Sequence, residues 1–206
     1  MTSPRSLRTP TWSIVALAFL AGAGATAFGV WEGGGWTKDG AVLAARYTAR
    51  IGLPVFLLAW SAAAMARLFP GGWRAILLRR RRAIGLAFAA THTIHLLALT
   101  TASLAFGEPT SLLGIVGGSV GYVFVFAMAL TSTDAAVRRL GARRWRLLHA
   151  SGGYVLAGIF AFSYYGRLER DPPLALVTLA LIAAAVVLRV AAWAKARLAA
   201  GRVSPA

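Results

Sequence analysis

Residues 79–106 read RRRRAIGLAFAATHTIHLLALTTASLAF. Four arginines are followed by a block, residues 83–106, that contains no Asp, Glu, Lys or Arg. At about 1.5 Å per helical residue, this block is long enough to cross the roughly 30 Å of hydrocarbon in a lipid bilayer. The stretch therefore predicts a transmembrane helix that begins at a basic boundary and carries His92 and His95 at membrane depth.

The chain contains five further apolar blocks of similar length, and short polar segments connect the six. They are rich in Ala and Leu and lack the alternation of membrane strands, which favours helices. We therefore predict an all-α fold, a polytopic membrane helix bundle that forms a single transmembrane domain over residues 1–206. Its six transmembrane helices are expected at about residues 11–31, 43–68, 83–106, 112–132, 146–166 and 173–193.

The composition excludes the other broad classes of protein. The 206 residues are 58% hydrophobic and 14% charged, whereas a soluble domain carries about 25% charged residues. The net charge is +16, but the basic residues flank apolar blocks and form no single patch, so we expect no nucleic-acid partner. The absence of cysteine excludes disulfides, cysteine-ligated iron–sulfur clusters and covalently attached haem.

The charges between the blocks predict the orientation of the chain. With both termini in the cytoplasm, most of the basic residues lie inside, as the positive-inside rule requires, and five of the six acids fall outside. The inner side then receives 17 of the 22 basic residues: Arg5, Arg8, Arg67, Arg74, Arg79, Arg80, Arg81, Arg82, Arg138, Arg139, Arg143, Arg144, Arg146, Arg189, Lys195, Arg197 and Arg202. The predicted location is the bacterial inner membrane, as a multi-pass protein.

The first apolar block has a second interpretation. Arg5 and Arg8, the apolar run and the small residues 21–27 also resemble a cleavable signal peptide. The apolar run continues to Trp31, which favours a permanent helix. Cleavage would leave five helices in the same orientation.

Three histidines are the candidate ligands of a metal or cofactor. His92 and His95 are three residues apart and so share one helix face, about 5–6 Å from each other, and His149 opens the fifth block. Polar side chains at membrane depth are costly and face the bundle interior or a cofactor, and imidazole is the usual axial ligand of b-type haem. The alternative is that these histidines form hydrogen bonds between helices. Four arginines near helix ends are candidate partners of haem propionates, or else snorkel to the interface: Arg46, Arg50, Arg81 and Arg82.

Two motifs resemble the ferric-reductase-like transmembrane family. RRRRAIGLAFAATHTIHLL, residues 79–97, resembles its Arg-Arg, Gly-Leu and His pattern on the third helix. GYVFVFAMALTSTDAAVRRLGARRWRLLHASGGYV, residues 121–155, resembles the segment in which Leu-Thr-Ser and a basic turn precede Trp and Leu-His. The similarity covers roughly residues 43–166, and the members that it resembles most are haem-binding membrane subunits of periplasmic methionine sulfoxide reductase systems.

The resemblance implies a six-helix bundle that carries haem b and moves electrons across the membrane. His95 matches the third-helix ligand of the family and His149 the first ligand of its fifth helix. A second fifth-helix histidine of the family has Ser163 as its counterpart here. Because a serine hydroxyl is a poor iron ligand, the number of haems, one or two, and the pairing of the histidines stay open. When depth is counted along each helix from its inner arginines, His92 and His149 are closer in depth than His95 and His149, which favours His92 and His149 as the two ligands of one haem. His95 then lies near Ser163 and Tyr164.

The predicted function is therefore electron transfer through haem b, to or from a partner redox protein or quinone. The chain is then an electron-transfer subunit of an oxidoreductase system rather than a complete enzyme, since no flavin or nicotinamide domain fits in its length. A quinone or a flavin is the candidate on the donor side. The alternative is a haem-free membrane scaffold, assembly or transport protein that retains the ferric-reductase-like fold.

Overall fold

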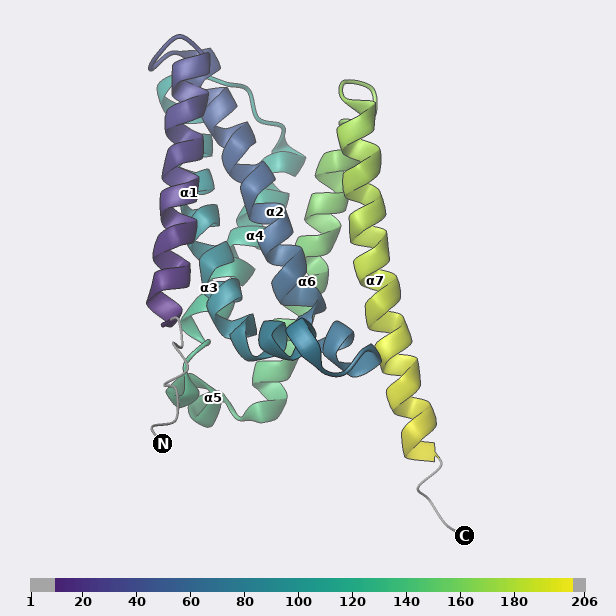
Figure 1. The fold of residues 1–206 in the computed structure, drawn as a ribbon. Helices are drawn as coiled ribbons and strands as arrows, with labels where there is room; N and C mark the ends of the chain where they lie inside the picture. The colour runs from purple at the N-terminus through teal and green to yellow at the C-terminus, as the bar shows by residue number, and fades with distance from the viewer. Residues whose placement is uncertain (1–9, 202–206) are drawn as a thin grey trace, which may run out of the picture.

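The structure is a computed structural model that describes residues 10–201, all of whose regular elements are helices. Six helices are long and apolar enough to cross a membrane, which confirms the predicted all-α membrane bundle. Figure 1 shows them side by side. They are α1 (Thr11–Glu32), α2 (Lys38–Leu68), α3 (Gly72–Thr100) with its π-helical extension η1 (Thr101–Ala105), α4 (Leu112–Leu130), α6 (Ala142–Tyr165) and α7 (Pro172–Gly201).

The helices extend beyond the apolar blocks that predicted them. Helix α3 begins at Gly72 rather than at residue 83, and α7 continues to Gly201 rather than ending near residue 193. Arginine and lysine are good helix formers, so a helix continues through its basic boundary although hydropathy falls there. The basic turn after α4 also forms a short helix, α5 (Asp134–Leu140), whose N-cap Thr133 accepts a hydrogen bond from the Ala136 N–H.

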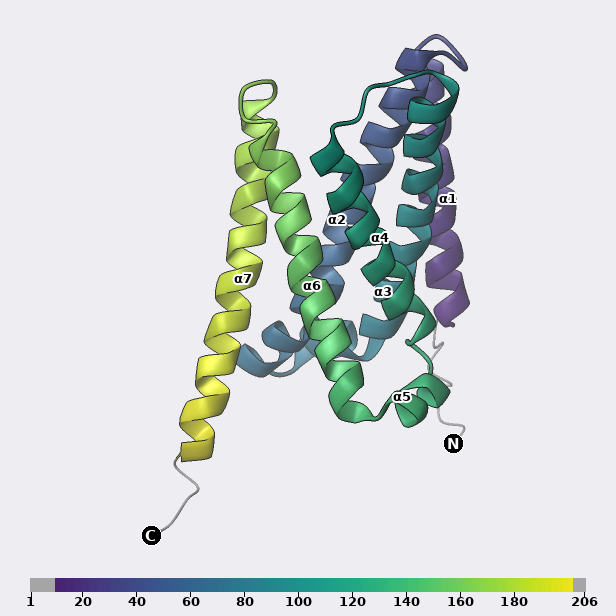
Figure 2. The ribbon, with the colours of Figure 1, turned by 180° about the vertical axis from the view of Figure 1, so that it is seen from behind.

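Helix α2 is the central element of the bundle. It packs against α1, α3 and α7, while α6 packs against α4 and α7 (Figure 2). The core between these helices is aromatic, and Phe56, Phe88 and Phe160 of α2, α3 and α6 contact one another there. The outward faces are apolar as well, as a lipid-facing surface requires, with Leu17 of α1 69% exposed and Val187 of α7 65% exposed.

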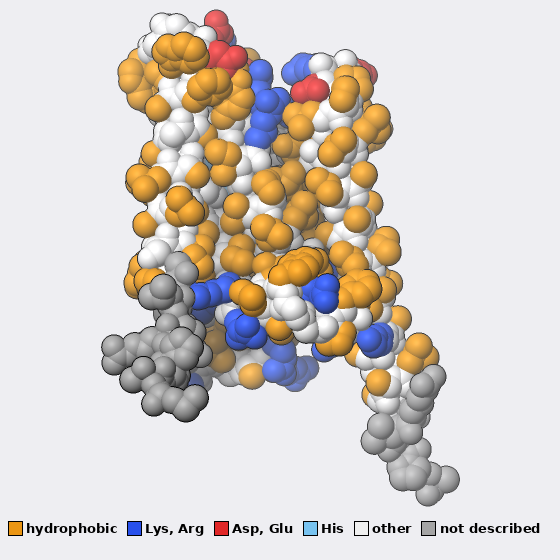
Figure 3. Space-filling view, in the orientation of Figure 1, with side chains coloured by type: hydrophobic (Ala, Val, Ile, Leu, Met, Phe, Trp, Pro, Cys, Tyr) orange, Lys and Arg blue, Asp and Glu red, His pale blue; other side chains and the backbone are white. Residues whose placement is uncertain are grey.

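The charged side chains are separated between the two ends of the bundle. On the face in Figure 3, the acidic side chains lie at the upper end and most of the basic ones at the lower end. Helix α1 begins and α7 ends at this lower, basic end (Figure 1), as an even number of spans requires. Arg5, Arg8 and Arg202 lie outside the described residues. That the basic end faces the cytoplasm stays a prediction from the positive-inside rule.

Candidate haem site

The two histidines of α3 lie together inside the bundle. Their ring centroids are 5.4 Å apart, as expected for residues three positions apart on one helix face. His92 is 7% exposed and packs against Phe88 one turn earlier, with ring centroids 4.2 Å apart. The structure therefore buries the His92 imidazole in the core and leaves His95, beside it, partly buried.

His95 is held by a threonine of α2. The Thr48 hydroxyl donates its proton to the Ala44 carbonyl at 2.8 Å, and its oxygen lies 3.1 Å from His95 Nδ1. When that proton is donated to Ala44, the Thr48 oxygen accepts from the Nδ1–H of His95. In that arrangement Nε2 keeps its lone pair, which is the form in which histidine binds a metal.

His92 is held by shape and not by a hydrogen bond. Its Nδ1–Cε1 edge lies against Gly52 of α2, where a Cβ atom would collide with the ring. Nδ1 is buried and has no hydrogen-bond partner among the described residues. On its other sides the ring contacts Phe160 of α6, at 5.5 Å between centroids, and Tyr122 of α4, at 6.3 Å. The Tyr122 hydroxyl is likewise buried without a partner.

His149 forms a separate site on α6. Its ring stacks on Trp145 at 4.2 Å between centroids, and its Nε2 lies 3.2 Å from the Thr131 hydroxyl at the end of α4. Within residues 10–201, no three side chains of His, Asp or Glu come together as a metal-binding group. The structure therefore brings together His92 and His95 but leaves His149 apart from them.

The ring contact with Phe160 gives the level of His92 along α6. Phe160 is eleven residues beyond His149, which is about 16 Å along a helix axis at 1.5 Å per residue. His92 is therefore level with the outer half of α6 and not with His149. The expected neighbour of His95, Ser163, is exposed, and the buried positions of this part of α6 are Phe160 and Tyr164.

The two inner candidate arginines have different surroundings. Arg82 is exposed and forms an ion pair with Asp134 of α5 at 3.1 Å. Arg81 is partly buried, and its Nε donates to the Ala59 carbonyl of α2 at 3.2 Å. Only Arg81 thus points into the bundle with its charge unpaired by a carboxylate.

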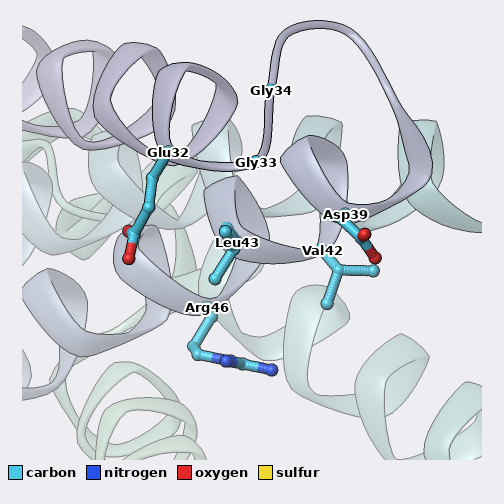
Figure 4. Close-up of a pocket in the computed structure, with 7 residues that line it drawn as sticks. All are labelled: Glu32, Gly33, Gly34, Asp39, Val42, Leu43 and Arg46. Atoms are coloured by element: carbon cyan, nitrogen blue, oxygen red, sulfur yellow. The ribbon is translucent and has the colours of Figure 1, made fainter.

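The two outer candidates lie one turn apart on α2. Arg46 lines a pocket of about 550 Å³ together with the carboxylates of Glu32 and Asp39, at the end of α1 and the start of α2 (Figure 4). Arg50 lies 3.5 Å from Asp171. Arg167, in the turn after α6, lies near these two arginines. Burial lowers the pKa of its guanidinium, and the positive charges of Arg46 and Arg50 lower that pKa as well. Neither Arg46 nor Arg50 contacts a histidine in the contacts described above.

Comparison with known proteins identifies the family. The sequence is 30% identical over 167 residues to the protein-methionine-sulfoxide reductase haem-binding subunit MsrQ of Yersinia pseudotuberculosis, an alignment that covers 76% of this chain and 78% of that protein. The chain belongs to the MsrQ family. MsrQ of Yersinia pestis gives the same identity over 77% of its length. MsrQ of Cronobacter sakazakii is 36% identical over 110 residues, which are 50% of this chain and 53% of that protein.

No family model matches the chain, and no solved structure matches it. Membership in the MsrQ family confirms the resemblance found in the two motifs. The MsrQ relatives are bacterial, and with the six apolar helices they agree with a multi-pass protein of the bacterial inner membrane.

Sequence reasoning missed the residues that orient the histidines. Thr48 and Gly52 lie one turn apart on α2, and both face α3. Their signal in the sequence is weak, because threonine and glycine are common in transmembrane helices. The sequence signal for these two residues is their spacing of four on the helix that precedes the histidine pair.

Proposed function

We propose that this chain is a haem-b-binding membrane subunit that transfers electrons across the bilayer, to or from a partner redox protein or quinone. The observation that carries the proposal is the His95–Thr48 pair. The pair presents an imidazole held at its Nδ1 inside a membrane bundle, and the MsrQ relatives are named as haem-binding subunits.

The buried residues fit such a cofactor in their chemistry. His95 would hold the iron through Nε2, while Thr48 keeps its ring from rotating. His92, whose Nδ1 has no partner, is a second imidazole with its ring centroid 5.4 Å from that of His95. Haem b supplies one-electron redox chemistry when bound, and the absence of cysteine rules out its covalent attachment.

The roles of the remaining candidates follow from their surroundings. His149 is a candidate ligand nearer the basic end, once its Nε2 leaves the Thr131 hydroxyl. Arg46 and Arg50 at one end and Arg81 at the other are candidate partners for propionates, since arginine pairs well with carboxylates. Arg82 is exposed and paired with Asp134 at 3.1 Å, more closely than Arg50 with Asp171 at 3.5 Å, which makes it the weakest of the four.

The test is the optical spectrum of the detergent-purified protein after haem-replete expression. The proposal expects a b-type Soret band that shifts on reduction with dithionite. His95→Ala should lose most of the bound haem, and His149→Ala should lose less, because His149 is already engaged with Thr131. A wild-type protein that folds but has no Soret band would refute the proposal.

A second function, a haem-free scaffold or assembly protein, is favoured by one observation on α6. At the level of His92 this helix presents Phe160, and Ser163 is exposed, so α6 offers no imidazole opposite the α3 pair. This alternative expects no haem in the purified wild type and no change in fold when His92 and His95 are both replaced by glutamine.

A further inference from the structure

Two arginines from different helices meet the same turn of α2 in the basic half of the bundle. Arg81 of α3 donates from Nε to the Ala59 carbonyl at 3.2 Å. Arg189 of α7 donates from Nη1 to the carbonyl of the next residue, Trp60, at 2.8 Å. The two guanidinium groups therefore approach consecutive carbonyls of one helix, and their positive charges lie close together.

No carboxylate neutralises this pair of charges. The ion pairs between described residues are Lys38–Glu108, Arg50–Asp171 and Arg82–Asp134, so neither Arg81 nor Arg189 has an acidic partner. Asp134, the one acid predicted on the inner side, thus already forms an ion pair with Arg82. Buried or membrane-embedded cations are found with a counter-charge, because an unpaired charge in a low-dielectric medium is costly.

Aromatic rings compensate only part of this cost. The Cζ atom of Arg189 lies 4.7 Å from the ring centroid of Trp60 and 5.1 Å from that of Tyr154, both favourable cation–π distances. Trp60 is fixed in place, because its indole packs closely on the backbone at Gly153 of α6. The Nε–H of Arg189 is nevertheless buried without a hydrogen-bond partner. The charged guanidinium of Arg189 therefore keeps one N–H donor without an acceptor.

The position of Arg189 on α7 argues against an ordinary interface arginine. It precedes Trp193 by four residues and Lys195 by six, which is about 6 and 9 Å deeper along the helix at 1.5 Å per residue. A snorkelling side chain extends toward the headgroups, whereas that of Arg189 turns inward to Trp60. Arg197 on the same helix shows the contrast, because it is exposed and lies over Trp193 near the helix end.

We propose that Arg81 and Arg189 form a binding site for a carboxylate or phosphate group between α2, α3 and α7. Arginine binds both groups through paired N–H donors. Two sources carry this chemistry at that depth, namely a propionate of a bound haem and the phosphate of an anionic phospholipid. The haem source rests on the proposed function, and the lipid source does not.

The experiment compares Arg189→Gln with Arg197→Gln, the matched control on the same helix. In the first arm, apoprotein is titrated with haem and with haem dimethyl ester, which lacks the propionate charges. If a propionate occupies the site, wild type and Arg197→Gln bind haem about 10- to 100-fold more tightly than the diester, and Arg189→Gln loses this preference. Arg189→Lys, which keeps the charge, should retain part of it.

In the second arm, the proteins are mixed with palmitoyl-oleoyl phosphatidylglycerol or phosphatidylcholine, and retained lipid is measured by native mass spectrometry. If a phospholipid occupies the site, wild type and Arg197→Gln retain phosphatidylglycerol, Arg189→Gln loses it, and the haem preference is the same in all. A wild type that binds no haem refutes the proposed function while this arm still tests the site. Arg81→Gln must behave as Arg189→Gln does, which keeps the test valid if one variant fails to fold. Arg189→Gln and Arg81→Gln variants that match the wild type in both arms would overturn the site.

Discussion

Replacing Thr48 with valine tests the link between α2 and the candidate haem ligand. Valine has nearly the same shape, so the buried space stays filled while the oxygen that accepts from His95 Nδ1 at 3.1 Å is lost. A buried donor left without an acceptor costs about 1–3 kcal/mol. Loss of a partner that orients a metal ligand costs about 10- to 100-fold in metal affinity. We therefore expect Thr48→Val to weaken haem binding by about 10- to 100-fold, measured by titrating the apoprotein and following the Soret band.

Thr91→Val is the matched control. Thr91 is also fully buried, and its hydroxyl also donates to a backbone carbonyl of its own helix, that of Phe88 at 2.9 Å. No hydrogen bond joins it to a histidine among the described contacts, so Thr91→Val should change haem affinity by less than about threefold, since a lost local hydrogen bond is worth about 1 kcal/mol or less of stability. Equal losses in the two variants would show that the Thr48 effect is one of packing, and would refute the assignment of His95 as an oriented ligand.

Three further predictions use the same purified protein or its gene. A reporter fused after Ala142 should report the cytoplasm, and a periplasmic signal there would contradict the orientation. Gly52→Ala should destabilise the protein by about 1–3 kcal/mol in thermal unfolding, because its Cβ collides with a buried imidazole, whereas Gly85→Ala has open space and should cost nothing. Phe160→His, at the position that contacts His92, should shift bound haem toward a six-coordinate low-spin spectrum, and Ser163→His at the exposed position should leave the spectrum unaltered. The opposite ranking would mean that α6 is rotated when haem is bound.

Hydropathy predicted the number and nature of the membrane-spanning helices because both depend on local sequence. Each span needs about 20 apolar residues, and a chain in lipid must satisfy its backbone within each helix. The ends were less predictable, as the early start of α3 at Gly72 shows. Hydropathy falls at a basic segment, but the backbone there keeps its helical hydrogen bonds.

The site was predictable only as far as one helix determines it. The spacing of His92 and His95 on α3 places them on one face, and the rings are indeed neighbours. The 14-residue spacing of His149 and Ser163 also places those two on one face of α6. Phe160 lies within about 60° of Ser163 around the helix, and the rotation of α6 against its neighbours places Phe160 inward and leaves Ser163 exposed. Rotation and register are set by packing between distant segments, so residues such as Thr48 were not identifiable from α3 alone.

The unsatisfied polar atoms of this bundle have a consistent location. Among the described residues, the buried side-chain nitrogen and oxygen atoms without a hydrogen-bond partner belong to Arg50, Trp60, His92, Tyr122 and Arg189. Each such atom costs about 1–3 kcal/mol, and in hydrocarbon no water replaces the missing partner. Helix α1, which faces lipid over much of its surface, contributes none of them, whereas α2 contributes two. These atoms thus lie on α2, α3, α4 and α7, and they include one histidine of the α3 pair and one arginine of the inner pair. A bundle that needed only to be stable would fill these positions with apolar side chains, so their polar atoms are best explained by ligands that bind between the helices.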